Sequence, residues 1–228
     1  GARKAQLGAG TQQQIILGLA RVYRASGKDA LQLYTQFLKV YPGSPFLPDA
    51  RLGLSRSYMD KKQYQQAIEG FKRLQESFPD HPYSVAAHRD IGDVYAALNS
   101  PQRSLAAYQR HLALSPNAED SARTELRMGG VYRKLLRWTD LAVEIFSRLS
   151  ENENSNVAGP AQFQLGQTHE AAGNNNLAIR EYRVYLERFA GQSNAHQAEN
   201  HIRYLTSYAP RGPVDRELID LIGLGSND

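Results

Sequence analysis

The sequence predicts an all-α fold of stacked helical hairpins, because several positions repeat at a spacing of 37 residues. Self-similarity at a fixed period of this length is the signature of a repeat architecture. Five positions of the repeat show the same spacing. The first unit is two residues shorter in its internal turn, so Leu19 precedes Leu54 by 35 residues. The repeated positions are Tyr58, Tyr95, Tyr132 and His169; Pro42, Pro79 and Pro116; Ala30, Ala67, Ser104, Leu141 and Ala178; Tyr34, Phe71, Tyr108, Ile145 and Tyr182; and Leu19, Leu54, Ile91, Met128 and Leu165.

Each unit contains two amphipathic stretches. In the second unit, Ala50, Leu54 and Tyr58 lie four residues apart and share one face of a helix that starts near Pro48. After a short polar turn a second apolar stripe follows, with the spacing of three and four residues that a helix requires. Its members are Tyr64, Ala67, Ile68, Phe71 and Leu74, and Pro79 ends the helix because proline cannot continue the backbone hydrogen bonds.

Small residues recur at one register, where two helices would need to approach each other closely. They are Ser55, Gly92, Gly129 and Gly166. A glycine inside a helix costs up to about 1 kcal/mol relative to alanine, so its recurrence indicates a packing reason.

The predicted organisation is a flexible segment 1–10, five hairpins over 11–190, and a C-terminal region 193–228. The hairpins are expected at 11–43, 48–80, 84–117, 120–152 and 157–190. Residues 194–208 are expected to form a capping helix, because an end of such a stack must be covered. A short apolar helix is predicted over 214–224. It is interpreted either as a second cap or as a tail that docks into a neighbouring chain or into a groove formed by the stack itself.

The pattern of a small residue, an aromatic, a second small residue, a second aromatic and a closing proline resembles the tetratricopeptide repeat over residues 11–190. Segments such as Tyr41-Pro42-Gly43-Ser44-Pro45 are similar to a bacterial subtype that is common in envelope proteins. Examples of that subtype are the lipoprotein subunit of the outer-membrane β-barrel assembly machine and the coordinator protein of the Tol–Pal system. The resemblance implies a right-handed α-α superhelix of about five hairpins with C-terminal capping helices. In the last two units Glu153 and Ala190 replace the closing proline, and His169 replaces an aromatic.

In that family the first helix of each hairpin lines a concave groove that holds a partner. The resemblance therefore implies a groove with several basic side chains, including Arg21, Arg56 and Arg89, which would attract an acidic peptide or a C-terminal carboxylate through forked hydrogen bonds. The alternative is that these arginines pair with neighbouring carboxylates and only hydrate the surface. Carried over by register, the groove residues are Arg21, Arg24, Asp49, Arg56, Met59, Asp60, Arg89, Asp93, Arg123, Arg133, Lys134, Phe163 and Glu170.

Motifs for catalysis, cofactors or metals do not emerge from the sequence. It has no cysteine, no phosphate-binding glycine loop and no His-Glu-x-x-His motif, so we expect no enzyme activity, no cofactor and no metal site. His196 and His201 are five residues apart and would not share a helical face. No apolar run is long enough to span a bilayer.

The expected function is a non-catalytic scaffold for protein–protein interaction. Its partner would be a protein or peptide, and an acidic one if the basic groove residues are available to bind it. The envelope resemblance favours a periplasmic or outer-membrane-associated location, in which the chain would assemble or position partners. A cytoplasmic adaptor for an acidic peptide is the first alternative. An RNA-binding helical repeat is the second, suggested by a pI of about 9.2 but weakened because the tyrosines fall at core positions and acidic residues outnumber basic ones after residue 114.

Overall fold

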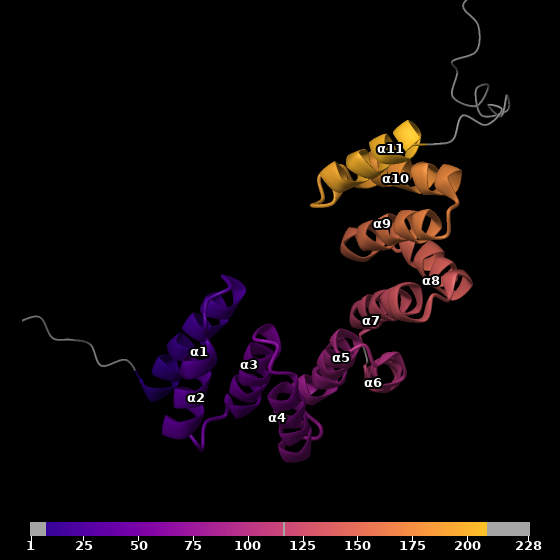
Figure 1. The fold of residues 1–228 in the computed structure, drawn as a ribbon. Coiled ribbons are helices and arrows are strands. Elements are labelled where there is room, and N and C mark those ends of the chain that lie inside the picture. The colour runs from indigo at the N-terminus through magenta and orange to yellow at the C-terminus, as the bar shows by residue number, and fades with distance from the viewer. Residues whose placement is uncertain (1–7, 116, 209–228) are drawn as a thin grey trace, which may run out of the picture. The chain divides into compact units, whose positions relative to one another are not determined.

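The computed structural model describes residues 8–115 and 117–208, which contain eleven α-helices, one π-helix and no strand (Figure 1). The all-α prediction is confirmed. The chain divides into two compact units, Gly1–Trp138 and Thr139–Asp228. The boundary falls inside the predicted fourth hairpin. The helices are α1 (Ala9–Ala25), α2 (Leu31–Val40), α3 (Leu47–Asp60), α4 (Tyr64–Ser77), α5 (Pro82–Ala97), α6 (Pro101–Leu114), α7 (Ala118–Val131), the π-helix η1 (Tyr132–Leu136), α8 (Thr139–Ser150), α9 (Ser155–Ala171), α10 (Asn175–Phe189) and α11 (Ala195–Tyr208).

The first unit is a stack of helical hairpins, α1–α2, α3–α4 and α5–α6, followed by α7 and η1. The second helix of each hairpin packs on the first helix of the next, so that α2 contacts α3, α4 contacts α5 and α6 contacts α7. The first helices also touch in succession, α1 with α3, α3 with α5 and α5 with α7. This arrangement places α1, α3, α5 and α7 side by side along one surface.

Close approach of the helices depends on small residues, as the sequence predicts at Gly92 and Gly166. A Cβ atom added to Gly92 would lie 2.4 Å from the ring of Tyr108, and one added to Gly166 would lie 2.7 Å from the ring of Tyr182. Both distances are far below van der Waals contact, so these positions admit glycine alone without a shift of the buried ring. Tyr108 and Tyr182 are almost fully buried.

The outer face of α1 is the exception to the repeat pattern. Leu19 is 45% exposed, whereas Ile91 at the same register of α5 is 7% exposed. Ile15 and Val22, on the same face as Leu19, are also exposed. The physical reason is that α4 covers the corresponding face of α5, while no helix of the described residues precedes α1.

One residue in the left-handed backbone region follows each of α1, α3, α5, η1 and α9. After α1 and α9 it is a glycine, Gly27 with φ of 71° and Gly173 with φ of 78°. After α3, α5 and η1 it is Lys62, Asn99 and Arg137. A side chain in this conformation costs roughly 1–2 kcal/mol.

The second unit contains α8, the hairpin α9–α10 and α11. Its core is a cluster in which the ring of Phe163 lies 5.6 Å from that of Tyr182 and 5.5 Å from that of Tyr185. Helix α11 packs on α10 through Ala198 and Leu205, at the place where the sequence predicts a capping helix. The predicted tail helix 214–224, Pro116 and most of the N-terminal segment 1–10 lie outside the described residues.

Candidate protein-binding surface

A series of ion pairs ties the first helices of the first unit to one another. Arg21 of α1 pairs with Asp49 near the start of α3, and one turn later in α1 Arg24 Nε lies 2.7 Å from Asp60 Oδ2 at the end of α3. Further along, α3, α5 and α7 are joined in the same way. We call this surface the ion-pair face; it consists of Arg21, Arg24, Asp49, Arg56, Asp60, Arg89, Asp90, Asp93, Asp120 and Arg127.

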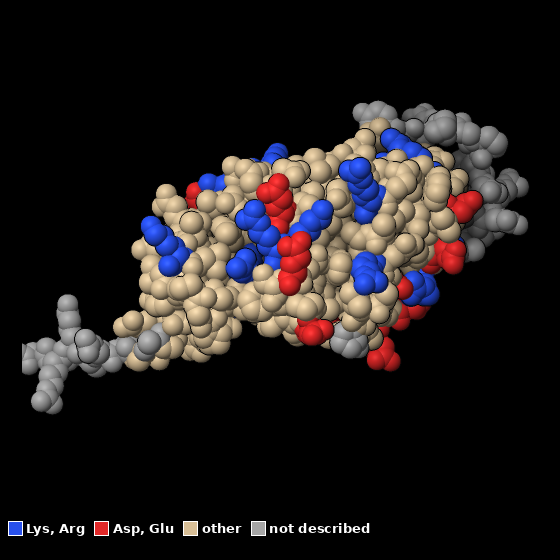
Figure 2. Space-filling view, turned by 90° about the horizontal axis from the view of Figure 1, so that it is seen from below, with Lys and Arg blue, Asp and Glu red and all other residues tan. Residues whose placement is uncertain are grey.

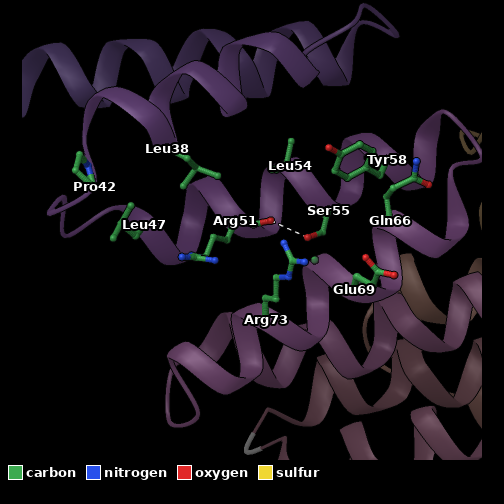
Figure 3. Close-up of a pocket in the computed structure, with 11 residues that line it drawn as sticks. Leu38, Pro42, Leu47, Arg51, Leu54, Ser55, Tyr58, Gln66, Glu69 and Arg73 are labelled. Atoms are coloured by element: carbon green, nitrogen blue, oxygen red, sulfur yellow. Dashed lines mark hydrogen bonds between the residues drawn. The ribbon is translucent and has the colours of Figure 1, made fainter.

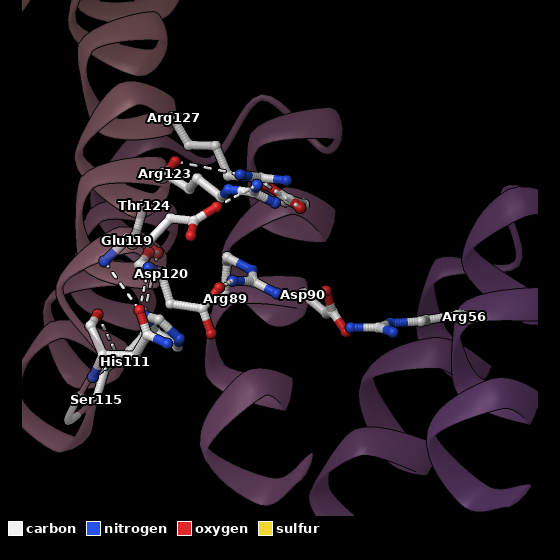
Figure 4. A network of polar contacts seen from close by, with 12 residues as sticks. Arg56, Arg89, Asp90, His111, Ser115, Glu119, Asp120, Arg123, Thr124 and Arg127 are labelled. Atoms are coloured by element: carbon white, nitrogen blue, oxygen red, sulfur yellow. Dashed lines mark hydrogen bonds and ion pairs between the residues drawn. The ribbon is translucent and has the colours of Figure 1, made fainter. Parts of the chain in front are cut away.

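The pair between Arg56 and Asp90 is the most buried contact of the ion-pair face. Arg56 Nε lies 2.7 Å from Asp90 Oδ2, and the two side chains are 24% and 7% exposed. Arg89 Nη1 reaches Asp120 Oδ1 at 2.9 Å (Figure 4). Each of these bonds spans two consecutive hairpins, because its partners are 34 and 31 residues apart.

Asp93 is bound from two sides. Tyr108 donates its hydroxyl to Oδ1 at 2.6 Å, and Arg127 Nε lies 3.0 Å from the same oxygen. Burial nevertheless raises the pKa of Asp93 above its ordinary value, and Arg127 and the Tyr108 hydroxyl only partly offset that increase. Burial beside the Asp93 carboxylate likewise raises the pKa of Tyr108. The phenol therefore stays protonated and acts as a donor.

Behind the ion-pair face, polar contacts continue into the core at His111. Thr124 Oγ1 donates to the backbone oxygen of Asp120 at 2.9 Å and lies 3.0 Å from His111 Nδ1 (Figure 4). His111 is 1% exposed, and burial, with a further contribution from Arg89, lowers its pKa below the ordinary value. This network joins α7 to α6, and the burial of His111 favours the neutral form of its imidazole.

The structure thus favours the second of the two interpretations given for the arginines. Arg21, Arg24, Arg56 and Arg89 do not form an open cationic array, because each one has an aspartate partner. Charges of both signs also lie next to each other on the surface seen in Figure 2. A partner of the ion-pair face would therefore meet alternating charges, many of them already paired.

The remaining predicted groove residues of the first unit have mixed surroundings. Met59 is half-buried against the core of the second hairpin. Arg123 pairs with Glu119 one helical turn earlier. Lys134 is exposed and lines a pocket of about 220 Å³ with Arg127, and Arg133 is half-buried.

In the second unit Phe163 is not a surface residue, contrary to the prediction. It is 4% exposed, because α10 and α11 enclose it and the ring of His201 stands edge-on at 6.1 Å. Glu170 is held by two neighbours: it accepts the Tyr182 hydroxyl at 2.7 Å and lies 2.8 Å from His201 Nδ1. Helix α11 therefore covers residues that would be exposed if this face were a binding groove.

Sequence reasoning missed Asp90, Asp120 and Arg127 as members of the ion-pair face. A signal was available: in three cases an Arg and an Asp about one repeat apart lie on successive first helices, as in Arg56 and Asp90. Opposite charges spaced by about one repeat would therefore have indicated the ion-pair face.

Comparison with known proteins agrees with this architecture. Residues 46–117 match the family model of the tetratricopeptide repeat, and that segment covers the hairpins α3–α4 and α5–α6. Solved structures extend the likeness to most of the chain. TTC0263, a thermophilic TPR protein of Thermus thermophilus, has a TM-score of 0.65 at 20% identity and covers 83% of this chain and 98% of its own. The chain has the tetratricopeptide-repeat fold.

Two further structures show how general this tetratricopeptide-repeat fold is. A tetratricopeptide repeat protein from Parabacteroides merdae has a TM-score of 0.62 at 14% identity, over 92% of this chain and 80% of its own. YrrB, a TPR protein with an unusual peptide-binding site, has a TM-score of 0.53 at 18% identity, over 81% of this chain and 90% of its own. No curated protein sequence matches the chain. In the described residues no helix combines the length and apolar character needed to cross a bilayer.

Proposed function

We propose that this chain is a non-catalytic scaffold that holds a partner polypeptide, and that the ion-pair face of the first unit is one of its binding surfaces. The observation that carries the proposal is the tetratricopeptide-repeat fold in which α1, α3, α5 and α7 line up along one surface. Such repeats are quasi-one-dimensional and present extended surfaces to partners.

The chemistry of the ion-pair face favours a partner segment with charges of both signs. Arg21, Asp60 and Asp120 keep about half of their side-chain surface exposed, at 58%, 44% and 44%, although each is paired. A partner can add a second hydrogen bond to each of these groups without breaking the pair, since a carboxylate has four acceptor sites and a guanidinium five donors. Charge complementarity of this kind sets specificity and register more than affinity.

The setting we propose is a bacterial envelope machinery, in which the chain assembles or positions partners. This part rests on the resemblance of the proline-containing segments between hairpins, such as Tyr41-Pro42-Gly43-Ser44-Pro45, to envelope-type repeats.

The test is affinity capture from lysate of the source organism, with immobilised chain and with a variant in which the ion-pair face is blocked. Ala97→Trp suits this purpose, because Ala97 is exposed on α5 one turn after Asp93 and belongs to no ion pair. Gln109→Trp on the exposed side of α6 is the matched control. Proteins kept by the parent chain and the control but lost from Ala97→Trp support the proposal.

Retention of the same proteins by all three chains would contradict the assignment of the ion-pair face. Double charge reversal of Arg56 and Arg89 is unsuitable as a blocking variant. It would place carboxylates against Asp90 and Asp120 and would perturb folding as well as binding.

A further inference from the structure

A pocket of about 390 Å³ lies on the opposite side of α3 from the ion-pair face, between α2, α3 and α4 (Figure 3). At 100° per residue, Arg51, Ser55 and Tyr58 point away from Asp49, Arg56 and Asp60 of the same helix. We call this site the outer pocket. It is lined by Leu38, Pro42, Leu47, Arg51, Leu54, Ser55, Tyr58, Gln66, Glu69, Gly70 and Arg73.

The lining of the outer pocket combines apolar and cationic side chains. Leu38, Leu47 and Leu54 contribute apolar surface, while Arg51 of α3 and Arg73 of α4 supply two guanidinium groups. In Figure 3, Arg73 extends from α4 toward Ser55. Glu69 is the one acidic side chain of the lining, and its Oε1 already accepts a hydrogen bond from Gln65 at 3.0 Å. The lining therefore has a net positive charge.

Neither guanidinium group of the outer pocket has a hydrogen-bond or ion-pair partner among the described residues. The arginines of the ion-pair face each have an aspartate. The Nε atom of Arg51 is buried without a hydrogen bond, which is also true of Arg89 Nε on the ion-pair face. The difference is therefore the carboxylate partner, which Arg89 has and the two arginines of the outer pocket do not.

Stacking of the repeats does not require the side chains that line the outer pocket. One repeat further, Gln75 and Ser84 stand where Leu38 and Leu47 stand here, and Gln75 Nε2 donates to the backbone oxygen of Ser84 at 3.2 Å. His88 takes the place of Arg51. Arg73 does recur one repeat further, as Arg110, but the two leucines and Arg51 do not, so the next hairpin lacks this combination of apolar and cationic side chains.

Gly70 forms part of the floor of the outer pocket. A Cβ atom added there would lie 2.3 Å from Ser55 Oγ, so glycine leaves room for that hydroxyl. At the next repeat the pair is reversed in size, with Gly92 in place of Ser55 and Ala107 in place of Gly70.

We propose that the outer pocket binds the C-terminus of a partner polypeptide whose last residue is apolar. The α-carboxylate and the last side chain leave the same carbon atom, and the pocket offers guanidinium forks and leucines side by side. Arginine binds carboxylates through paired, charge-assisted hydrogen bonds. The volume is in the lower part of the range of about 300–1,000 Å³ that is typical of ligand pockets, which suits one or two residues.

The outer pocket is separate from the ion-pair face. It gives the proposed scaffold a second kind of ligand, a polypeptide C-terminus. Blocking at Ala97 tests the ion-pair face, and loss of C-terminus binding tests the outer pocket, so either proposal can fail while the other stands.

The experiment uses two fluorescein-labelled peptide pools with four randomised residues followed by a C-terminal leucine. One pool has a free carboxylate and the other is amidated, and binding to the full chain is followed by fluorescence polarisation. We expect the free acid to bind at least about tenfold more tightly, because the amide removes the charge that the two arginines recognise. Arg51→Gln and Arg73→Gln should each weaken binding of the acid pool.

Arg110→Gln is the matched control, since Arg110 is exposed on α6 at the same register as Arg73 and does not line the outer pocket. It should leave binding unchanged. Equal affinity of the acid and amide pools, absence of binding, or equal effects of Arg73→Gln and Arg110→Gln would each overturn the proposal. Displacement of the acid pool by inorganic phosphate at equal concentration would also overturn it, because the pocket would then be a general anion site. Circular dichroism of each variant shows that any loss is not unfolding.

Discussion

Removal of Arg56 is expected to destabilise the first unit more than removal of any exposed member of the ion-pair face. Its partner Asp90 is 5% exposed and would be left as a buried carboxylate beside Asp93. Breaking a buried pair from one side costs about 3–5 kcal/mol. Since the Arg56 side chain keeps 24% of its surface exposed, water can reach part of the site, and we expect about 2–3 kcal/mol for Arg56→Met. Methionine retains most of the aliphatic stem.

The double variant Arg56→Met/Asp90→Leu should recover most of this loss, because replacement of both ions by apolar residues is often nearly neutral. Arg24→Met is the control. Its pair with Asp60 has exposed fractions of 31% and 44%, and it should cost below about 1 kcal/mol.

The assay is urea unfolding followed by circular dichroism, together with amide hydrogen exchange in α3 and α5, because a repeat stack need not unfold in one step. Equal losses for Arg56→Met and Arg24→Met would refute the reasoning. An additive double variant would refute it as well.

Three further changes follow from the structure. Lys62→Gly should stabilise the second hairpin by about 0.5–1 kcal/mol in thermal unfolding, since φ is 59° at this position; a loss would mean that the turn is not held in the left-handed region. Gly70→Ala should destabilise by about 1–3 kcal/mol through overpacking against Ser55, and Ser55→Gly in the same chain should restore stability, as urea midpoints would show. His111 has a lowered pKa because it is buried, so the unfolded chain takes up its proton first as the pH falls below about 6.5. Stability should therefore be fully present above that pH and decrease below it, and His111→Gln should flatten this part of the pH profile; an unchanged profile would contradict the assignment.

The fold could be predicted from the sequence because its signals are local and repeated. Apolar spacing within each helix, glycine at Gly92 and Gly166, and the prolines between hairpins all follow from contacts that recur every 37 residues. The exposure of Leu19 could not be read from the repeat, because register alone does not tell whether a neighbouring helix is present.

The site was harder to predict, since a register assigns a residue to a face but does not give its partner. Arg56 was placed on the expected surface, yet its buried contact with Asp90 depends on how far two helices are offset along their axes. Phe163 shows the same difficulty: its register implies a groove position, but α11 covers it. The outer pocket was missed because it depends on Leu38, Leu47 and Gly70, which belong to three different helices.

The most direct test of the central claim, that this chain holds a partner polypeptide on its ion-pair face, is site-specific photocrosslinking in cells of the source organism. A benzoylphenylalanine at Ala97 reports on the ion-pair face, and one at Gln109 reports on the exposed side of α6. We expect discrete crosslinked partners from position 97 that are weak or absent from position 109. Crosslinks of equal pattern from both positions, or none from position 97, would contradict the account.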